Sequence, residues 1–112
     1  MLQRELLNLE NAEMISASTR DIPVGTIIGI DSDDKSVLVA NVNGQFYAIN
    51  NICTHMGCSL SNGILSGNQV QCPCHGSTFD VTTGSLVHGP AKLPEPSYKV
   101  IVDGEKITVD VS

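Results

Sequence analysis

The chain has 112 residues, so it is expected to form one domain, near the lower end of what can bury a core unaided. Two Phe, two Tyr and no Trp leave that core to aliphatic side chains, while ten Gly and five Pro favour turns and short strands. The net charge of −6 argues against electrostatic binding to nucleic acid or to an anionic membrane.

The N-terminal residues 1–11 carry acidic side chains where a secretory signal peptide needs an apolar segment. The sequence contains no apolar run of about 18 residues, so we expect a cytoplasmic protein without a membrane anchor. Leu2, Leu6 and Leu9 lie at helical spacing. Because so short a helix is marginal alone, an N-terminal extension is favoured over a partner-docking helix.

From Ala12 onward the pattern predicts short antiparallel strands joined by tight turns. The Asn43-Gly44 pair stands between two β-rich runs and is the strongest short-range hairpin signal in the chain. Near the C-terminus polar and apolar residues alternate, which indicates a strand with one buried face. Strands are expected over residues 14–18, 26–30, 37–42, 45–49, 98–102 and 106–111. The predicted fold class is therefore all-β.

Two boxes rich in Cys and His follow the expected strand ends at Ile52 and Gln71, which places them on loops. Two thiolates and two imidazoles supplied as mixed pairs suit a [2Fe–2S] cluster with Cys on one iron and His on the other. The boxes are Cys53-Thr54-His55-Met56-Gly57-Cys58 and Cys72-Pro73-Cys74-His75-Gly76-Ser77.

A Cys2His2 zinc site is the alternative for the same four residues. Paired zinc ligands are typically two to four residues apart, and Cys53 and His55 are closer than that. Zinc would also leave Cys58 and Cys74 unexplained. A zinc-stabilised binding module is thus the rival hypothesis, and such a protein would be colourless.

The two boxes resemble, residue for residue, those of Rieske iron–sulfur proteins. The resemblance covers residues 12–112 and implies antiparallel β-sheets, with a small cluster-binding subdomain inserted into a base domain at about residues 50–89. It implies a [2Fe–2S] cofactor in which Cys53 and Cys72 bind one iron. His55 and His75 would bind the other iron at the protein surface.

The resemblance also implies a disulfide between Cys58 and Cys74, which sit at corresponding places in the two boxes. Such a disulfide ties the ligand loops together in the high-potential members of the family. A cytosolic disulfide is unusual, so two free buried thiols are the alternative.

Other residues near the boxes match the family pattern or depart from it. Ser77 matches a serine whose hydroxyl donates to a bridging sulfide, and Pro90 lies in a segment that resembles the proline loop covering the cluster. Gly57 and Gly76 are expected to permit positive φ or a close backbone approach beside the cluster. Phe79 departs from the high-potential pattern, which has a Tyr that donates to a cysteine sulfur.

No Asp, Glu, Lys or Arg occurs between Ser36 and Phe79. Apolar strands and ligand loops leave little room for charge, which accounts for part of this bias. Because a carboxylate near the cluster would oppose the addition of an electron, the absence of charge would also favour reduction. A charge-free tip would dock on a partner through shape and apolar contact.

The resemblance implies one-electron transfer by a soluble, monomeric Rieske-type ferredoxin that serves redox protein partners. The alternative is a dedicated subunit of an oxidoreductase complex, such as a molybdenum oxidase or a ring-hydroxylating oxygenase. Ferredoxins of aromatic-ring dioxygenases are similar in length but lack the extra cysteine pair. An enzyme is not expected, because the metal and disulfide roles use all four Cys and two His and leave no open site.

Overall fold

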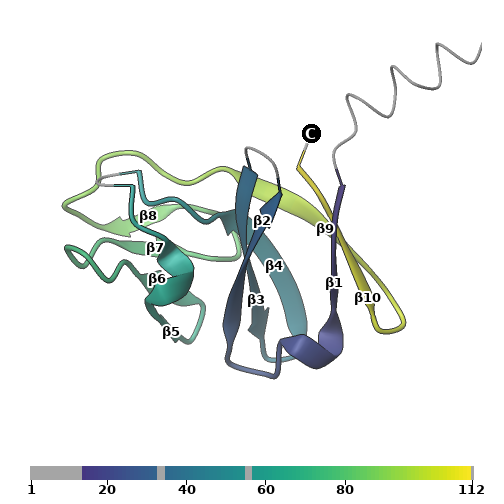
Figure 1. The fold of residues 1–112 in the computed structure, drawn as a ribbon. Helices are drawn as coiled ribbons and strands as arrows, with labels where there is room; N and C mark the ends of the chain where they lie inside the picture. Colours follow the sequence, from purple (N-terminus) through teal and green to yellow (C-terminus); the bar gives the residue numbers. More distant parts are fainter. Residues whose placement is uncertain (1–13, 33–34, 55–56, 112) are drawn as a thin grey trace, which may run out of the picture.

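The computed structural model describes residues 14–32, 35–54 and 57–111, which form ten strands in two antiparallel sheets and two short 3₁₀ helices (Figure 1). The prediction of an all-β fold is confirmed. Residues 1–11, expected to form an N-terminal extension, lie outside the described residues, and so does His55. Within the described ranges, no helix is long and apolar enough to cross a membrane.

The larger sheet contains six strands in the order β1-β10-β9-β4-β3-β2. The predicted hairpin is present: Asn43 and Gly44 both have positive φ, 56° and 92°, as a two-residue turn of the I′ type requires. Each predicted strand is found, with ends that differ by at most two residues. The strands are β1 (Met14–Ser18), β2 (Ile27–Ser32), β3 (Lys35–Val42), β4 (Gln45–Asn50), β9 (Ser97–Asp103) and β10 (Lys106–Asp110). The helix η1 (Thr19–Asp21) follows β1.

Strand β3 is buried on both faces and separates two apolar cores. Val37 and Val39 point into one core, which also contains residues of β1 and β10. Leu38 and Ala40 point into the other, which contains Cys53 and Cys72. Because successive strand residues face opposite sides, an uninterrupted apolar run is what a strand between two cores needs.

The smaller sheet has the order β5-β6-β7-β8 and lies at one end of the molecule, on the left in Figure 1. The Asp80 carboxylate closes the turn after β7, since it accepts hydrogen bonds from the Thr82 N–H at 2.8 Å and the Thr82 hydroxyl at 2.6 Å. The strands are β5 (Ile64–Ser66), β6 (Gln69–Gln71), β7 (Thr78–Asp80) and β8 (Leu86–His88), preceded by helix η2 (Leu60–Asn62).

Asn51, which is 3% exposed, fixes the point where the chain leaves the larger sheet for the first box. Its side-chain amide donates to the Ser36 hydroxyl at 3.0 Å and accepts from the Ser61 N–H at 2.8 Å. Its backbone bonds to Ser36 and Leu60. Asn51 therefore joins the start of β3, helix η2 and the first box, and the sequence analysis did not identify it.

Candidate metal centre

The two boxes form loops with the same hydrogen-bond pattern. In each loop the cysteine N–H donates to the carbonyl five residues later, and the glycine N–H four residues later donates to the cysteine carbonyl. The bonds are Cys53 N to Cys58 O (2.8 Å), Gly57 N to Cys53 O (3.0 Å), Cys72 N to Ser77 O (2.7 Å) and Gly76 N to Cys72 O (3.1 Å). The chain thus presents Cys53 and Cys72 on equivalent backbones.

Gly57 and Gly76 close these loops with φ values of 77° and 84°. This left-handed region is strained for residues with a Cβ and costs glycine nothing. The expectation of positive φ at both positions is confirmed.

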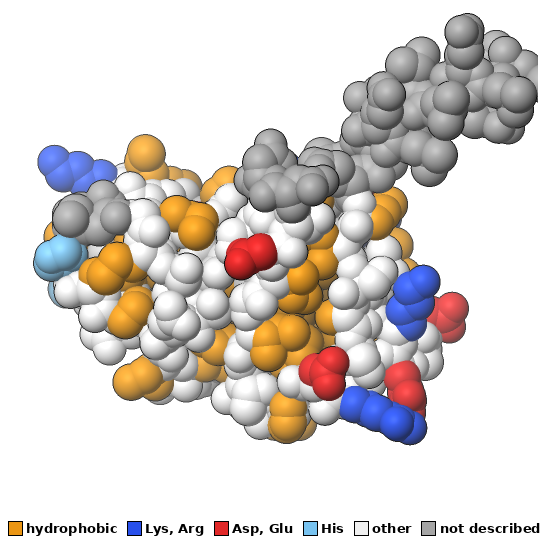
Figure 2. Space-filling view, viewed as in Figure 1, with side chains coloured by type: hydrophobic (Ala, Val, Ile, Leu, Met, Phe, Trp, Pro, Cys, Tyr) orange, Lys and Arg blue, Asp and Glu red, His pale blue; other side chains and the backbone are white. Residues whose placement is uncertain are grey.

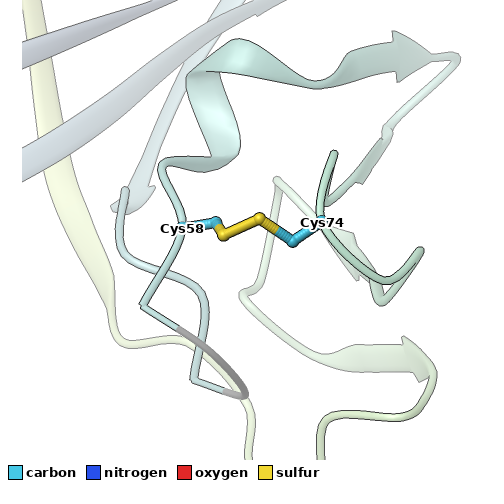
Figure 3. The surroundings of a disulfide bond; sticks show 2 residues. All are labelled: Cys58 and Cys74. Carbon is cyan, nitrogen blue, oxygen red and sulfur yellow. A yellow bond between two sulfur atoms is a disulfide. The ribbon is translucent and has the colours of Figure 1, made fainter.

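Cys53 and Cys72 form no disulfide, and both are only 3% exposed. They belong to the apolar core that lies between the two sheets. Cys58 and Cys74 form a disulfide that crosses between the loops, with Cα atoms 6.5 Å apart (Figure 3). The Cys72 sulfur lies within 4.8 Å of both disulfide sulfurs. Since Cys58 and Cys74 are bonded to each other, Cys53 and Cys72 are the cysteines that could hold a metal.

The predicted disulfide pairing is present, but Cys58 and Cys74 do not hold corresponding places. In the shared loop pattern Cys58 is equivalent to Ser77, the fifth residue after the cysteine. Cys74 is the second residue after its cysteine, as His55 is in the first box. The disulfide thus links the end of the first loop to the start of the second. A comparison of the two boxes by residue type missed the different positions of Cys58 and Cys74, because the backbone hydrogen bonds decide which positions of the two loops correspond.

His75 is exposed on the second loop, in contrast to the buried cysteines. In the view of Figure 2, the histidine side chains lie at the left end of the molecule among apolar side chains. The acidic side chains visible on that face lie elsewhere. Figure 2 also shows a Lys or Arg side chain at this end, so the tip has exposed histidine, as expected, but is not free of charge.

A segment after β8, residues 89–96, contacts both loops, and we call it the strap. The Ala91 N–H donates to the Ser77 hydroxyl of the second loop at 2.9 Å. On the first loop, the Thr54 hydroxyl donates to the Leu93 carbonyl at 2.8 Å and the Thr54 N–H donates to the Glu95 carboxylate at 3.0 Å. The strap begins with a cis Gly89-Pro90 bond and ends where Asn50 N donates to Pro96 O at 2.9 Å.

Ser77 and Phe79 are fully buried beside the cysteines. The Ser77 oxygen accepts from Ala91, and this leaves its own hydroxyl hydrogen to donate elsewhere. The predicted donation to a sulfide is compatible with this contact. The acceptor role of Ser77 was missed, because nothing in the sequence indicates that a segment 14 residues away supplies a donor.

The charge-free stretch of sequence predicts ligand loops without a carboxylate beside them, and Glu95 shows that this expectation is wrong. Its side chain is only 4% exposed and bonds directly to the first loop, although it lies outside the charge-free stretch of sequence. Burial raises the pKa of the Glu95 carboxyl group from 4.5 to about 7, although the hydrogen bond from the Thr54 N–H lowers it. The fold therefore places an ionisable group beside the first box.

The donor set fits an iron–sulfur cluster. Two buried cysteines outside the disulfide stand on equivalent loops, and an imidazole is exposed on one of these loops. Soft thiolate ligands suit iron–sulfur clusters and zinc alike. The two loops with matching backbones and a disulfide between them agree with the paired binding boxes of the sequence prediction, which were assigned to a [2Fe–2S] cluster.

Comparison with known proteins identifies the family. Residues 12–99 match the Rieske [2Fe-2S] domain. The chain therefore belongs to the Rieske [2Fe-2S] domain family, and its cofactor is a [2Fe–2S] cluster, as predicted. The rival hypothesis of a zinc module is not supported.

The chain is similar in sequence to proteins of two kinds, and it spans different shares of their lengths. It is 34% identical over 92 residues to the ferredoxin component of a naphthalene 1,2-dioxygenase system from Pseudomonas aeruginosa, covering 82% of this chain and 88% of that protein. It is 33% identical over 106 residues to the cytochrome b6-f complex iron-sulfur subunit of Chlorobaculum thiosulfatiphilum, covering 95% of this chain and 56% of that subunit.

Among solved structures, the chain is similar to the ferredoxin of carbazole 1,9a-dioxygenase from Nocardioides aromaticivorans IC177. The TM-score is 0.83 at 31% identity, covering 91% of this chain and 99% of that one. The predicted function, one-electron transfer by a Rieske-type ferredoxin, is confirmed by these likenesses.

Proposed function

We propose that this chain carries single electrons between a reductase and a terminal oxidoreductase, with Cys53, His55, Cys72 and His75 as the ligands of its cluster. The observation that carries the ligand set is the pair of equivalent loops, each with a buried cysteine outside the disulfide, Cys53 and Cys72. When bound, the [2Fe–2S] cluster accepts and releases one electron at a potential raised by its histidine ligands.

The surrounding residues would keep the site rigid and partly dry. The core around Cys53 and Cys72 excludes water from the thiolates, which strengthens every hydrogen bond to them. The disulfide and the strap hold the two loops together. An exposed His75 would place one edge of the site where a partner can reach it.

The likeness to ferredoxins favours a separate carrier as the form of the protein. The chain is 34% identical to a dioxygenase ferredoxin and superposes on another with a TM-score of 0.83. We therefore propose a monomeric, cytoplasmic ferredoxin, not itself an enzyme, with an oxygenase system as partner. Its residues 12–112 would form one domain, with the cluster-binding subdomain at about 50–89. A permanent subunit of an oxidoreductase complex is the second candidate, because the disulfide is a feature of complex-bound, high-potential relatives.

Metal analysis and two histidine substitutions test the proposed ligand set. Freshly purified protein should contain equal amounts of iron and acid-labile sulfide and, once reduced, give an electron paramagnetic resonance signal typical of nitrogen-ligated mixed-valence iron. His75→Cys should lower the potential, because it adds a thiolate charge. His88→Cys is the matched control, since His88 is exposed on β8 and matches no ligand position. Stoichiometric zinc without sulfide would contradict the proposal.

The two candidate forms differ in how the native protein behaves in a lysate. A separate carrier should elute from a sizing column at the mass of one chain, 11.9 kDa, and should accept electrons from an added reductase. Co-elution with a large catalytic subunit through several columns would favour the complex instead.

A further inference from the structure

Glu95 is the one charged side chain that is buried among the described residues. Its carboxylate accepts the N–H of Thr54, the residue between the proposed ligands Cys53 and His55. Its backbone is held as well: the Glu95 N–H donates to the Gly84 carbonyl at 2.8 Å, and a Cβ at Gly84 would collide with the Glu95 carbonyl oxygen. The carboxylate is thus delivered to the first loop by a fixed segment.

We propose that Glu95 is a positioning residue for the first ligand loop and that its carboxylate lowers the reduction potential of the cluster. The inference rests on the proposed function, because it takes Cys53 and His55 as ligands. It assigns to the strap a role in setting the potential, besides covering the loops.

The positioning role follows from the contacts of Thr54. Its N–H bonds to Glu95 and its hydroxyl bonds to Leu93, so two bonds from the strap fix one residue of the loop. A charge-assisted bond to a carboxylate is stronger than one between neutral groups. Restraint at Thr54 passes directly to the residues on either side of it, which are the proposed ligands.

The electrostatic role follows from burial and from the lack of a paired cation among the residues that the structure describes. Among the described residues, Glu95 makes no ion pair. Lys92 on the strap is exposed, so solvent screens its charge. A buried carboxylate is screened much less, and its charge opposes the negative charge that reduction adds. A glutamine could accept the same bond without the cost of burying a charge.

Three variants separate charge from contact. Glu95→Gln removes the charge and keeps an oxygen that can accept from Thr54. Thr54→Val removes the hydroxyl bond to Leu93 and keeps the charge. Glu105→Gln removes the same charge from an exposed site, 62% accessible, in the β9–β10 turn. All are loaded with cluster and measured by protein-film voltammetry at pH 8.5, where Glu95 is ionised.

We expect Glu95→Gln to raise the equilibrium constant for reduction about tenfold, or about 59 mV for one electron. Thr54→Val should change that constant less than about threefold but shorten the half-life of the visible cluster absorbance on heating. Glu105→Gln should change neither. A loaded Glu95→Gln protein with an unchanged paramagnetic spectrum and a potential equal to wild type would overturn the inference.

Failure to load is also decisive. If Glu95→Gln takes up no cluster, Glu95→Asp, which keeps the charge and shortens the side chain, should still load and change the equilibrium constant for reduction less than about threefold. Failure of both variants to load would assign Glu95 to assembly of the site and not to its potential, and would overturn the inference. A wild-type protein without iron and sulfide would refute the proposed function itself. A loaded wild type whose potential ignores Glu95→Gln would refute only the role of Glu95.

Discussion

At the scale of residues, buried polar side chains around the ligand loops each form specific hydrogen bonds. Asn51 bonds to Ser36 and Ser61, Ser77 to the strap, and Glu95 to the first loop. Among the described residues no buried side-chain nitrogen or oxygen lacks a partner. Because an unpaired buried polar group costs about 1–3 kcal/mol, these residues are expected to tolerate little change.

Substitutions at Ser77 and Phe79 should shift the reduction potential of the cluster in opposite directions. A hydrogen bond to a sulfide or a ligand sulfur withdraws negative charge and favours the reduced cluster. Ser77→Ala should lower the potential and Phe79→Tyr raise it, each by about 40 mV, which corresponds to about 1 kcal/mol for one electron. Voltammetry of the three proteins at one pH measures this. The starting potential should lie between those of dioxygenase ferredoxins and quinol-oxidising relatives.

Two results would contradict this account. Ser77→Ala also leaves the Ala91 N–H without its acceptor, so a loss of stability alone, with no change in potential, would assign Ser77 to the strap only. For Phe79→Tyr, the account fails if the hydroxyl reaches the sulfur of Cys53 or Cys72 and the potential stays unchanged.

Glu95 should make stability depend on pH. The native pKa of about 7 lies above the ordinary value of 4.5, so between these values the folded chain holds a proton that the unfolded chain has lost. Stability contributed by this group should therefore fall as pH rises from about 4.5 to 7, by at most about 1.4 kcal/mol per pH unit. Thermal unfolding of wild type and Glu95→Gln across pH 5–8 measures the difference. Parallel profiles would show that the carboxyl group does not titrate in this window.

At the scale of elements, the ligand loops are held by three connections: the β-strands before them, the disulfide between them and the strap across them. The described residues of both loops lie outside the strands and helices. Their order therefore depends on crosslinks and on hydrogen bonds to distant segments.

Loss of the disulfide should loosen the loops without abolishing the site. The bridge joins residues 16 apart, and a crosslink closing a loop of that size contributes about 3 kcal/mol in the chain-entropy estimate. Cys58→Ser with Cys74→Ser should still assemble a cluster but lose it at a lower temperature, as followed by visible absorbance. Mass spectrometry of native protein without reductant should find the two cysteines linked. Two freely alkylated thiols there, with the cluster intact, would be the contrary result.

Gly84 should be more sensitive to substitution than another glycine of the same backbone class. Gly84 has φ of 83° and its Cβ would meet the Glu95 carbonyl, whereas Gly104 has φ of 63° and open space around it. Gly104→Ala should cost about 1 kcal/mol for the left-handed backbone alone. Gly84→Ala should cost about 3 kcal/mol or more and shorten cluster retention, because the strap must move. Chemical denaturation of both variants gives the comparison, and equal losses would argue against a rigid strap.

At the scale of the whole molecule, β3 serves as a wall shared by two cores. One core packs β1 and β10 against β3 and β4 within the larger sheet. The other core packs that sheet against the smaller sheet and contains Cys53 and Cys72. The site is therefore built on the same strand that holds the rest of the fold together.

Neighbouring β3 residues should have separable effects. Leu38→Ala removes volume from the core that contains Cys53 and Cys72, and Val39→Ala removes it from the other core. Both should destabilise the fold, Leu38→Ala by about 2–5 kcal/mol. Only Leu38→Ala should broaden the paramagnetic signal and speed cluster loss at a temperature where both variants stay folded. Equal cluster loss in both would mean that the two cores respond as one.

The sequence by itself determined the class of fold and the identity of the cofactor. Strand ends, the Asn43-Gly44 turn and the positive φ of Gly57 and Gly76 depend on local conformational preference, which adjacent residues carry. The cluster follows from the chemistry of paired Cys and His, and the disulfide pairing from the family resemblance. These features need few long-range contacts to be recognised.

Only the tertiary structure decided what surrounds the loops. The Glu95–Thr54 bond spans 41 residues, and neither residue type nor spacing distinguishes Glu95 from the acidic residues that stay exposed. The same holds for the register of the loops, in which Cys58 corresponds to Ser77, and for the division of β3 between two cores. Such contacts arise from the packing of segments that are distant in the sequence. The sequence around the ligand loops contains no charged residue, and the strap, which folds against these loops, supplies the carboxylate of Glu95.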